Sequence, residues 1–321
     1  MQKTVLLTGG AGFIGSHVAE AYKQKGYRVL IVDNLYTGSK ENIADCVDGE
    51  AVLFFEVDVR DKDKLAAIFA EYRPSIINHH CAQKSVPASV EDPLNDLDIN
   101  LKGLLTLIEL TKEYPIENFI YVSSGGVLSK EITGNEKSKE TDVPQLQSPY
   151  AITKFAGEKY LEIYSAQYGF GYTALRYGNV YGPRQMPFGE CGVVPIFVEN
   201  ILNNRDSVLM AYDDMPDGCT RDYIYVKDVV DINMIVTERI TNEAYNISYG
   251  TELSMMQIFN ETKKAFHSDT NIKRQGFRKG DVRRSVLDSS YVYEKLGWKP
   301  KYSLEKGLQD LYQYVTKKMS E

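Results

Sequence analysis

The chain of 321 residues has few cysteines and no long apolar run, and these two absences exclude several classes of protein. Its cysteines, Cys46, Cys81, Cys191 and Cys219, lie far apart and form no Cys-x-x-Cys pair of the kind that binds zinc or carries out redox chemistry. We expect reduced thiols, as in a cytoplasmic protein. No window approaches roughly 18 apolar residues, and the chain starts "MQKTVLLTGG". We therefore expect no membrane span and no signal peptide.

Basic charge and histidine are also scarce. The sequence has 37 lysines and arginines against 44 aspartates and glutamates, a net charge of −7, whereas general nucleic-acid binders usually gather a basic excess on one face. We expect no nucleic-acid partner, and local arginines must hold any anionic ligand. The 4 histidines show no metal-ligand spacing. We expect no metal, and we interpret His79 and His80 as buried or loop-facing residues.

The composition is otherwise that of a globular protein, with 43% hydrophobic and 25% charged residues. Short β-branched runs alternate with helix-length segments, which indicates a parallel sheet covered by helices on both faces. The expected strands are residues 4–9, 28–34, 52–59, 75–81 and 118–124, and the expected helices are 14–25, 62–72 and 94–113. A further strand runs through 171–182, and the pattern then loosens. We predict an α/β fold with a Rossmann-type doubly wound sheet in residues 1–180 and a smaller, partly interleaved α/β domain in residues 181–321.

A glycine-rich turn, "TGGAGFIG", follows the first strand. It contains Gly10-x-Gly12-x-x-Gly15, and Gly9-x-x-Gly12-x-x-Gly15 overlaps this pattern. Such glycines allow a tight turn, a close approach of the backbone to a pyrophosphate, and close contact between helix and strand. The second strand ends in Asp33, 21 residues after Gly12, where a carboxylate bonds both ribose hydroxyls and repels a 2′-phosphate. This favours NAD over NADP; the alternative is a surface glycine turn beside an acidic strand end.

Asp58, in "EVDVRD" at the end of the third strand, has two interpretations. Its carboxylate can accept a hydrogen bond from an adenine amine, or it can cap the following helix. The sequence leaves both open.

The stretch "SPYAITK" places Tyr150 four residues ahead of Lys154, on the same face of a helix that starts after a proline. The simpler alternative is an exposed helix start. A tyrosine base at neutral pH needs its pKa lowered by about 3 pH units from ~10. One positive charge at ~4 Å supplies about 4 kcal/mol at an effective dielectric near 20, but only about 1 kcal/mol in bulk water. Only a partly desolvated pair is therefore sufficient.

Taken in order, the motifs "TGGAGFIG", "HHCAQKSV", "VSSGG", "YAITK", "RYGNVYGPRQ" and "RDYIYVKDVV" resemble the extended short-chain dehydrogenase/reductase family, and within it the UDP-glucose 4-epimerase group. The resemblance covers roughly residues 3–316. It implies that residues 1–180 bind NAD and that residues 181–321 bind a nucleotide-sugar. It also implies a homodimer through the helices at 94–113 and 150–168.

The resemblance further implies NAD-dependent 4-epimerisation of a UDP-sugar, UDP-glucose or UDP-galactose, through a transient 4-keto intermediate. Tyr150 is then the base, Lys154 acts mainly through the cofactor ribose and the local field, and Ser124 relays a proton. The NAD contacts implied are Gly9, Gly12, Phe13, Ile14, Gly15, Asp33, Asn34, Asp58, Val59, Lys84, Asn100, Tyr150, Lys154 and Tyr177. The substrate contacts implied are Ser124, Tyr150, Asn179, Arg221, Arg278 and Ser285. Simpler alternatives are a polar helix residue for Asn100 and an ion pair of Arg221 with Asp222 or Asp228.

The sequence departs from this family pattern in informative places. Ser129 and Lys130 stand where relatives usually have a Tyr-Gly pair. Dehydratases of the superfamily carry an Asp-Glu pair where this chain has Gly125 and Gly126, which disfavours 4,6-dehydration. Met186 replaces an arginine typical of relatives that act on uronic acids.

Ser285 stands at a position of variable size beside the sugar 2-position in similar epimerases. Its small side chain predicts that UDP-N-acetylglucosamine is accepted as well as UDP-glucose. Two alternatives stay open: another nucleotide-sugar epimerase or oxidoreductase of the family, for example one acting on UDP-glucuronate, and a non-catalytic NAD-binding sensor. Such sensors typically lose the tyrosine or the lysine, and this chain has both.

Overall fold

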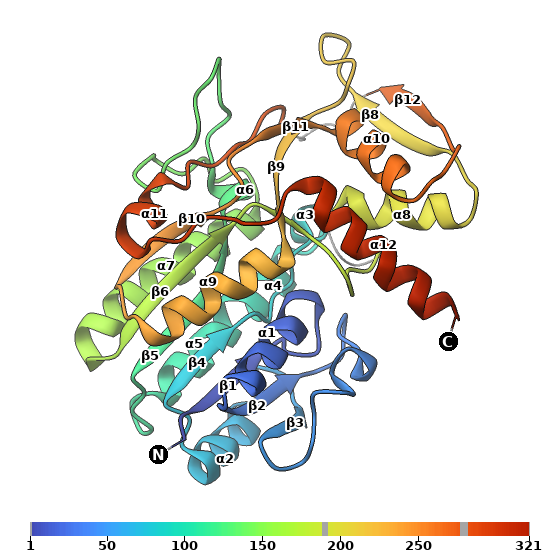
Figure 1. The fold of residues 1–321 in the computed structure, drawn as a ribbon. Coiled ribbons are helices and arrows are strands. Elements are labelled where there is room, and N and C mark those ends of the chain that lie inside the picture. Colours follow the sequence, from blue (N-terminus) through green and yellow to red (C-terminus); the bar gives the residue numbers. More distant parts are fainter. Residues whose placement is uncertain (1, 188–191, 277–281, 321) are drawn as a thin grey trace. The chain divides into compact units, whose positions relative to one another are not determined.

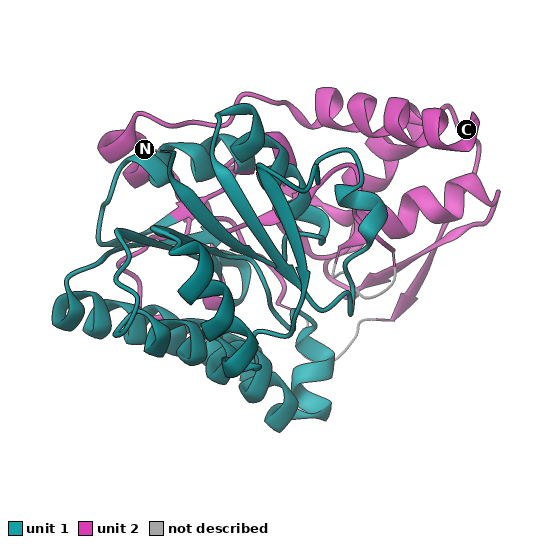
Figure 2. Ribbon diagram, turned by 90° about the horizontal axis from the view of Figure 1, so that it is seen from below, with its two compact units in different colours: residues 1–127, 146–176, 230–245 teal, residues 128–145, 177–229, 246–321 magenta. Residues whose placement is uncertain are grey.

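The structure is a computed structural model that describes residues 2–187, 192–276 and 282–320. The chain forms two compact units, coloured separately in Figure 2. Unit 1 contains residues 1–127, 146–176 and 230–245, and unit 2 contains residues 128–145, 177–229 and 246–321. The boundary at residue 180 between two domains stays a prediction.

Unit 1 is built on a seven-stranded sheet with the order β10-β6-β5-β4-β1-β2-β3. The pairs β1–β2, β1–β4, β2–β3 and β4–β5 are parallel, and Leu6 lies opposite Leu30 on one side and Ile77 on the other. The order β3-β2-β1-β4-β5-β6 is that of a doubly wound dinucleotide-binding sheet, and it reverses between β1 and β4. The predicted fold class is therefore confirmed. The strands are β1 (Thr4–Thr8), β2 (Arg28–Asp33), β3 (Val52–Glu56), β4 (Ile76–His79), β5 (Asn118–Ser124), β6 (Gly171–Tyr177) and β10 (Glu243–Ile247).

Helices cover both faces of this sheet (Figure 1). One face carries α1 (Phe13–Gln24) and α9 (Val226–Glu238), and the other carries α2 (Lys62–Tyr72), α5 (Gly103–Leu110) and α7 (Pro149–Tyr168). Between β2 and β3 lies the short helix η1 (Lys40–Ile43), and between β4 and α5 lie α3 (Val86–Glu91) and α4 (Pro93–Leu97). The four-residue helix α6 (Gly125–Leu128) directly follows β5.

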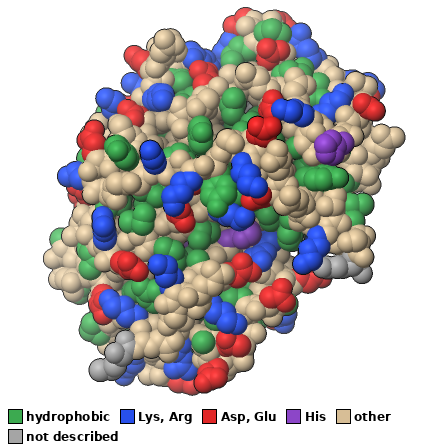
Figure 3. All heavy atoms as spheres, viewed as in Figure 1, with side chains coloured by type: hydrophobic (Ala, Val, Ile, Leu, Met, Phe, Trp, Pro, Cys, Tyr) green, Lys and Arg blue, Asp and Glu red, His purple; other side chains and the backbone are tan. Residues whose placement is uncertain are grey.

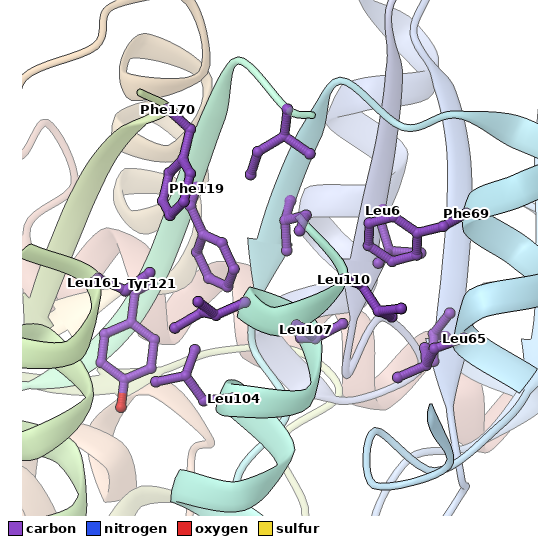
Figure 4. Packing of buried hydrophobic residues seen from close by; sticks show 14 of the residues in the cluster. Leu6, Leu65, Phe69, Leu104, Leu107, Leu110, Phe119, Tyr121, Leu161 and Phe170 are labelled. Atoms are coloured by element: carbon purple, nitrogen blue, oxygen red, sulfur yellow. The ribbon is translucent and has the colours of Figure 1, made fainter. Parts of the chain in front are cut away.

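A cluster of buried side chains joins β5 to α5 and α7 (Figure 4). Phe119 and Tyr121 alternate along β5, so both point to the same face of the sheet. Leu104 and Leu107 come from α5 and Leu161 from α7, and all five side chains are fully buried. Burying each such side chain contributes about 1.5–3 kcal/mol. This packing fixes α7, which carries the Tyr-x-x-x-Lys motif, against β5.

The helix expected at residues 94–113 is interrupted. After α4 the chain forms a π-helical turn, η2 (Asp98–Lys102), and then α5. The side chain of Asn100, inside the π-helical turn, bonds the main chain of Gln83 through both its oxygen and its nitrogen. Single π turns within helices occur frequently at functional sites.

Unit 2 contains two small sheets. One has the order β11-β9-β7, with β9 antiparallel to β11 and parallel to β7, and the other pairs β12 with β8 in parallel. The strands are β7 (Asn179–Tyr181), β8 (Ser207–Ala211), β9 (Thr220–Tyr225), β11 (Glu252–Ser254) and β12 (Ile272–Gly276). The helices are α8 (Val193–Leu202), α10 (Met255–Ala265), α11 (Ser290–Leu296) and α12 (Leu304–Ser320).

The surface is of mixed character. On the face shown in Figure 3, basic, acidic and apolar side chains are interspersed. Across the described part of the chain, no helix has both the length and the apolar character needed to cross a membrane.

Candidate active site

The glycine-rich turn adopts a geometry that requires glycine at two of its positions, Gly9 and Gly15. Gly9 has a φ of +68°, and a Cβ there would lie 2.7 Å from the main-chain nitrogen of Cys81. A Cβ on Gly15 would lie 2.2 Å from the carbonyl oxygen of Gly9, because α1 begins directly against the end of β1. Both glycines are therefore required by the packing of unit 1 itself.

Gly12 differs from these two glycines. It is the N-cap of α1 with an ordinary φ of −78°, and no side chain caps the helix there. A Cβ on Gly12 would meet a single neighbour within 4 Å, the carbonyl oxygen of Gly9 at 3.2 Å. The contact at Gly12 is thus less close than those at Gly9 and Gly15, and the next residues, Phe13 and Ile14, begin the helix. Main-chain N–H groups at such a helix start are suited to bind a phosphate group.

The carboxylate of Asp33 lies at the end of β2 beside this turn. It accepts hydrogen bonds from the main-chain nitrogens of Ala11 (3.0 Å) and Leu35 (2.8 Å). Burial raises its pKa, and the two amides act in the opposite direction. Asp33 is thereby held rigidly at the carboxyl edge of the sheet, next to the topological switch point.

Asp58 forms a tight ion pair rather than a helix cap. Its two oxygens accept from the guanidinium of Arg60 at 2.8 and 2.9 Å, and one also accepts from the side-chain amide of Asn34 at 2.8 Å. Bonding to Arg60 lowers the pKa of Asp58 to about 2. The cap of α2 is Asp61, so the alternative role of Asp58 as a helix cap is wrong. Val59, which lies between Asp58 and Arg60 in the sequence, is buried.

The helix α7 begins where the sequence predicts. Ser148 caps it by accepting from the main-chain nitrogen of Ala151 (3.1 Å), and Pro149 occupies the first helical position, where its missing N–H is not needed. Tyr150 therefore lies in the first turn and Lys154 in the second. Both side chains are buried, so the exposed helix start considered as an alternative is wrong.

Lys154 is a buried cation. Its Nζ donates to the carbonyl oxygen of Val122 at 2.9 Å and lies 5.9 Å from the ring centroid of Tyr150. Burial lowers its pKa to about 8, while the nearby Asp96 and Glu158 act to raise it. The structure thus provides the desolvated positive charge that a tyrosine base requires.

A buried ion pair supports the end of β5. Glu158, one turn after Lys154, accepts two hydrogen bonds from the guanidinium of Arg176 at 2.9 and 2.7 Å. It also accepts from the hydroxyl of Ser123 at 2.5 Å. Ser123 precedes Ser124, the last residue of β5. The pair therefore fixes the strand end that presents Ser124.

A second polar cluster joins α4 to α7. Asp96 is fully buried, and its oxygens accept from Thr153 (2.8 Å), Asn100 (2.9 Å) and Gln83 (2.9 Å). Burial raises the pKa of Asp96. The side chain of Asn100 thus orders the segment after β4, which carries Lys84 in a half-buried position.

Ser124 and Tyr150, two of the predicted substrate residues, lie in unit 1. Three others, Asn179, Arg221 and Ser285, lie in unit 2, as does the buried Tyr177, a predicted NAD contact. Asn179 donates to the carbonyl oxygen of Asp222 at 3.1 Å. Arg221 donates to the carbonyl oxygens of Thr220 (2.7 Å) and Arg283 (3.5 Å).

Neither of the ion pairs considered for Arg221 is formed. The carboxylate of Asp222 accepts from the main-chain nitrogens of Gly250 and Leu287, and that of Asp228 accepts from the main-chain nitrogen of Lys301. Those alternatives are therefore wrong. Burial raises the pKa of Asp222 to about 6.

Ser285 is buried, and its hydroxyl lies 2.9 Å from that of Ser129. The segment that carries Ser129 is tied to the strand-like segment around Ser285 by further main-chain bonds, from Ser138 to Val286 and from Asp288 back to Ser138. Arg278, the remaining predicted substrate contact, lies outside the described residues.

Sequence reasoning missed several residues that shape these sites. Arg60 and Asp96 bond predicted residues directly, to Asp58 and Asn100. The remaining three bond one another beside Ser124 and Lys154: Ser123, Glu158 and Arg176. Two of these missed residues had a usable signal, because Arg60 directly follows "DV" and Glu158 shares the helical face of Lys154. The others become neighbours only through the tertiary fold.

Comparison with known proteins gives consistent results. Residues 5–248 match the NAD dependent epimerase/dehydratase family. A UDP-glucose 4-epimerase of Thermotoga maritima, solved with UDP-glucose, is similar with 41% identity and a TM-score of 0.92 over 98% of this chain and 99% of that one. A UDP-glucose 4-epimerase of Thermus thermophilus, solved with NAD, shares 38% identity with a TM-score of 0.91 over 98% and 99% of the two chains. A UDP-N-acetylglucosamine 4-epimerase of Methanobrevibacter ruminantium shares 32% identity with a TM-score of 0.89 over 99% of each chain.

Proposed function

Because this chain belongs to the NAD dependent epimerase/dehydratase family, we propose that it is an isomerase that inverts C4 of a UDP-sugar, interconverting UDP-glucose and UDP-galactose. The observation that carries this proposal is the pair at the start of α7. Tyr150 and the buried cation Lys154 stand in the same unit as a dinucleotide-type glycine turn.

The residues of unit 1 fit NAD. The start of α1 at Gly12, which no side chain caps, suits a pyrophosphate, and the fixed carboxylate of Asp33 suits an adenosine ribose. Asn34 and Asp58 extend this polar edge, and Lys84 and Asn100 follow β4. When bound, NAD supplies the redox chemistry that takes C4 of the sugar through a ketone.

The protein's own residues manage the proton. We propose that Tyr150, as a phenolate, accepts the proton of the sugar 4-hydroxyl and later returns it to the 4-oxygen, once the ketone has presented its opposite face. The ammonium of Lys154 stabilises the phenolate electrostatically, because burial keeps water from screening it. Ser124 relays the proton from the end of β5.

Epimerisation also requires firm binding of the nucleotide and loose binding of the sugar. Arg221 and Asn179 are the proposed contacts of the UDP moiety in unit 2, since a guanidinium binds phosphate oxygens in a bidentate manner. Main-chain carbonyls orient the Arg221 guanidinium. The role of Arg278 stays a prediction.

Dehydration of the sugar is disfavoured by the first residues of α6. Gly125 and Gly126 occupy the positions where dehydratases resembling this chain carry a carboxylate pair, and a Cβ on Gly126 would meet no atom within 4 Å. The fold thus has room for a side chain at Gly126, but the sequence supplies no acid or base there. This supports simple epimerisation.

We also propose that UDP-N-acetylglucosamine is a substrate. Ser285 and its partner Ser129 are both small, which leaves more volume than the tyrosine found at either position in some relatives. The similarity to the Methanobrevibacter ruminantium enzyme supports this proposal.

The expected homodimer is part of the proposal. Leu94 on α4 and Ile152 and Ile163 on α7 are 77%, 52% and 60% exposed. Neighbouring exposed apolar side chains on two helices are typical of a contact surface. The cytoplasmic location stays a prediction.

The decisive experiment incubates the purified protein separately with UDP-glucose, UDP-N-acetylglucosamine and UDP-glucuronate and follows the C4 configuration by NMR. We expect conversion of the first two. Tyr150→Phe should lower the rate by about 10²–10⁴-fold, the usual contribution of general acid–base catalysis, without changing the circular dichroism spectrum. A near-normal rate for Tyr150→Phe would overturn the assignment of the base, and no conversion of any substrate would overturn the function.

A further inference from the structure

The ammonium of Lys154 has unusually little polar support for a buried cation. Only 2% of the residue is exposed, and the hydrogen bond seen for its Nζ is the one donated to the carbonyl of Val122. A buried ammonium is costly unless other groups compensate the lost hydration. Groups that do not bond the ammonium, among them Asp96 and Glu158, must therefore favour its charged form.

The aromatic ring of Tyr121 adds to this support. The Nζ of Lys154 lies 5.0 Å from the Tyr121 ring centroid, closer than the 5.9 Å to the ring of Tyr150. An ammonium within about 6 Å of a ring centroid is attracted by the negative face of the ring, most strongly when both are desolvated. We propose that Tyr121 is a positioning residue whose ring holds the ammonium of Lys154 charged and in place beside the base, Tyr150.

The surrounding structure keeps the ring in this position. Tyr121 is fully buried on β5, where it points towards α5 and α7 beside Leu104 (Figure 4). The ring of His79 stacks on it with centroids 6.0 Å apart and an interplanar angle of 14°, and His79 is itself bonded to the hydroxyl of Thr8 at 2.6 Å. The His79 ring, held by its bond to Thr8, thus supports the Tyr121 ring from the neighbouring strand β4.

Gly157 makes this arrangement sterically possible. It lies one turn after Lys154 on α7, and a Cβ there would lie 2.4 Å from the Tyr121 hydroxyl oxygen. A glycine inside a helix is unfavourable by about 1 kcal/mol relative to alanine. Glycine is needed at this position because α7 packs directly against the side chain of Tyr121.

Other ionisable groups act on the same ammonium. Asp96 on α4, Glu158 on α7 and Cys81 after β4 favour its charged form, whereas burial opposes it. The ring of Tyr121 remains neutral, since burial raises the pKa of its phenol well above the ordinary value. The histidines His79 and His80 are also neutral, because burial lowers both pKa values. The ring therefore contributes through its quadrupole and not through a charge.

The test compares Tyr121→Leu with two matched variants. Tyr121→Phe keeps the ring and removes the hydroxyl. Phe119→Leu makes an equal aromatic truncation on the same face of β5 and belongs to the same buried cluster. Lysine labelled with ¹³C at Cε allows the pKa of Lys154 to be followed by NMR, with Lys154→Met to assign its signal.

We expect Tyr121→Leu to lower the pKa of Lys154 by about one pH unit, in keeping with a desolvated cation–π contact, and Tyr121→Phe and Phe119→Leu to leave it unchanged. The alkaline limb of the kcat profile should move by the same amount. If Tyr121→Leu changes the pKa of Lys154 no more than Phe119→Leu does, the Tyr121 ring contributes only to packing and the proposal is overturned. Tyr121→Met, which fills more of the space, serves if the leucine variant does not fold.

The role of Tyr121 in catalysis rests on the proposed function, but the NMR titration requires no substrate. A change in the Lys154 pKa without any epimerase activity would contradict the proposed function and leave the cation–π contact established.

Discussion

The hydroxyl oxygens of Ser129 and Ser285 lie 2.9 Å apart in the interior of unit 2, although the residues are separated by 156 positions in the chain. Ser129 departs from the pattern that the sequence otherwise resembles, and Ser285 stands at a position of variable size in that pattern. The two positions are therefore not independent, because each small side chain faces the other. A large residue at either position would displace its partner.

Replacing Ser285 by tyrosine should exclude the larger sugar. We expect kcat/KM for UDP-N-acetylglucosamine to fall roughly ten- to a hundredfold, the effect of about 1–3 kcal/mol of steric conflict, with a much smaller change for UDP-glucose. Ser129→Ala, which keeps the volume small, is the control and should leave the ratio of the two substrates unchanged. An equal loss for both substrates in Ser285→Tyr would indicate general damage rather than selection.

The two glycines at the start of α1 should respond differently to alanine. In Gly12→Ala the new Cβ would meet only the carbonyl oxygen of Gly9, at 3.2 Å, so we expect a small effect on folding and NAD binding that is roughly tenfold or more weaker. In Gly15→Ala the new Cβ would clash with the carbonyl oxygen of Gly9, and we expect a loss of more than about 2 kcal/mol in unfolding free energy. Calorimetric NAD titration and urea unfolding distinguish the two effects. Equal stability of both variants would contradict this assignment.

The buried ammonium of Lys154 should make stability depend on pH. Burial lowers its pKa from 10.5 to about 8, so between these values the unfolded chain binds more protons than the folded one, and stability rises with pH. The difference between the two pKa values destabilises the folded chain by about 3 kcal/mol. This destabilisation is fully present below pH 8 and disappears towards pH 10.5. The Lys154→Met variant has no ionisable group at this position, so its stability should lack this dependence on pH.

Urea unfolding of both proteins at several pH values measures the effect. We expect the stability of the native chain relative to Lys154→Met to increase by about 3 kcal/mol from pH 7.5 to pH 10.5. Catalytic activity should instead fall above pH 8, because the cation that supports Tyr150 is lost. A pH-independent difference between the two proteins would show that Lys154 titrates normally.

The buried pair of Glu158 and Arg176 should be sensitive to the loss of one partner. Glu158→Gln leaves a buried guanidinium without its counter-charge, and we expect a loss of about 3–5 kcal/mol in unfolding free energy. The double variant Glu158→Gln/Arg176→Met should recover much of this loss. If the double variant is no more stable than Glu158→Gln, the charge pairing is not the cause.

The exposed apolar side chains of α4 and α7 should control the oligomeric state. Leu94→Glu combined with Ile152→Glu places two charges on this surface, and we expect sedimentation to show a dimer for the native chain and a monomer for the variant. Val143→Glu is the control, because Val143 in unit 2 is 85% exposed and lies on neither helix. A native chain that is already monomeric would contradict the homodimer.

Local patterns determined much of the fold. The sequence predicts β5 and α2 with the bounds that the structure has, and α7 within one residue, because each follows from a strong periodicity and a clear start or stop signal. The break of the helix at Asn100 could not be predicted, because it accompanies bonds to Gln83, 17 positions away.

For the site, the sequence by itself determined the residue types and their local spacing: the glycine turn, the carboxylate at Asp33, and Tyr150 and Lys154 on one helical face. Only the tertiary structure decided the environment of those residues. The pKa of Lys154 depends on burial and on neighbours from other elements, among them Asp96 on α4. Its ammonium lies beside the ring of Tyr121 and the carbonyl of Val122, both on β5. Such long-range electrostatic and packing terms arise when strands and helices distant in sequence come together, so no local pattern records them.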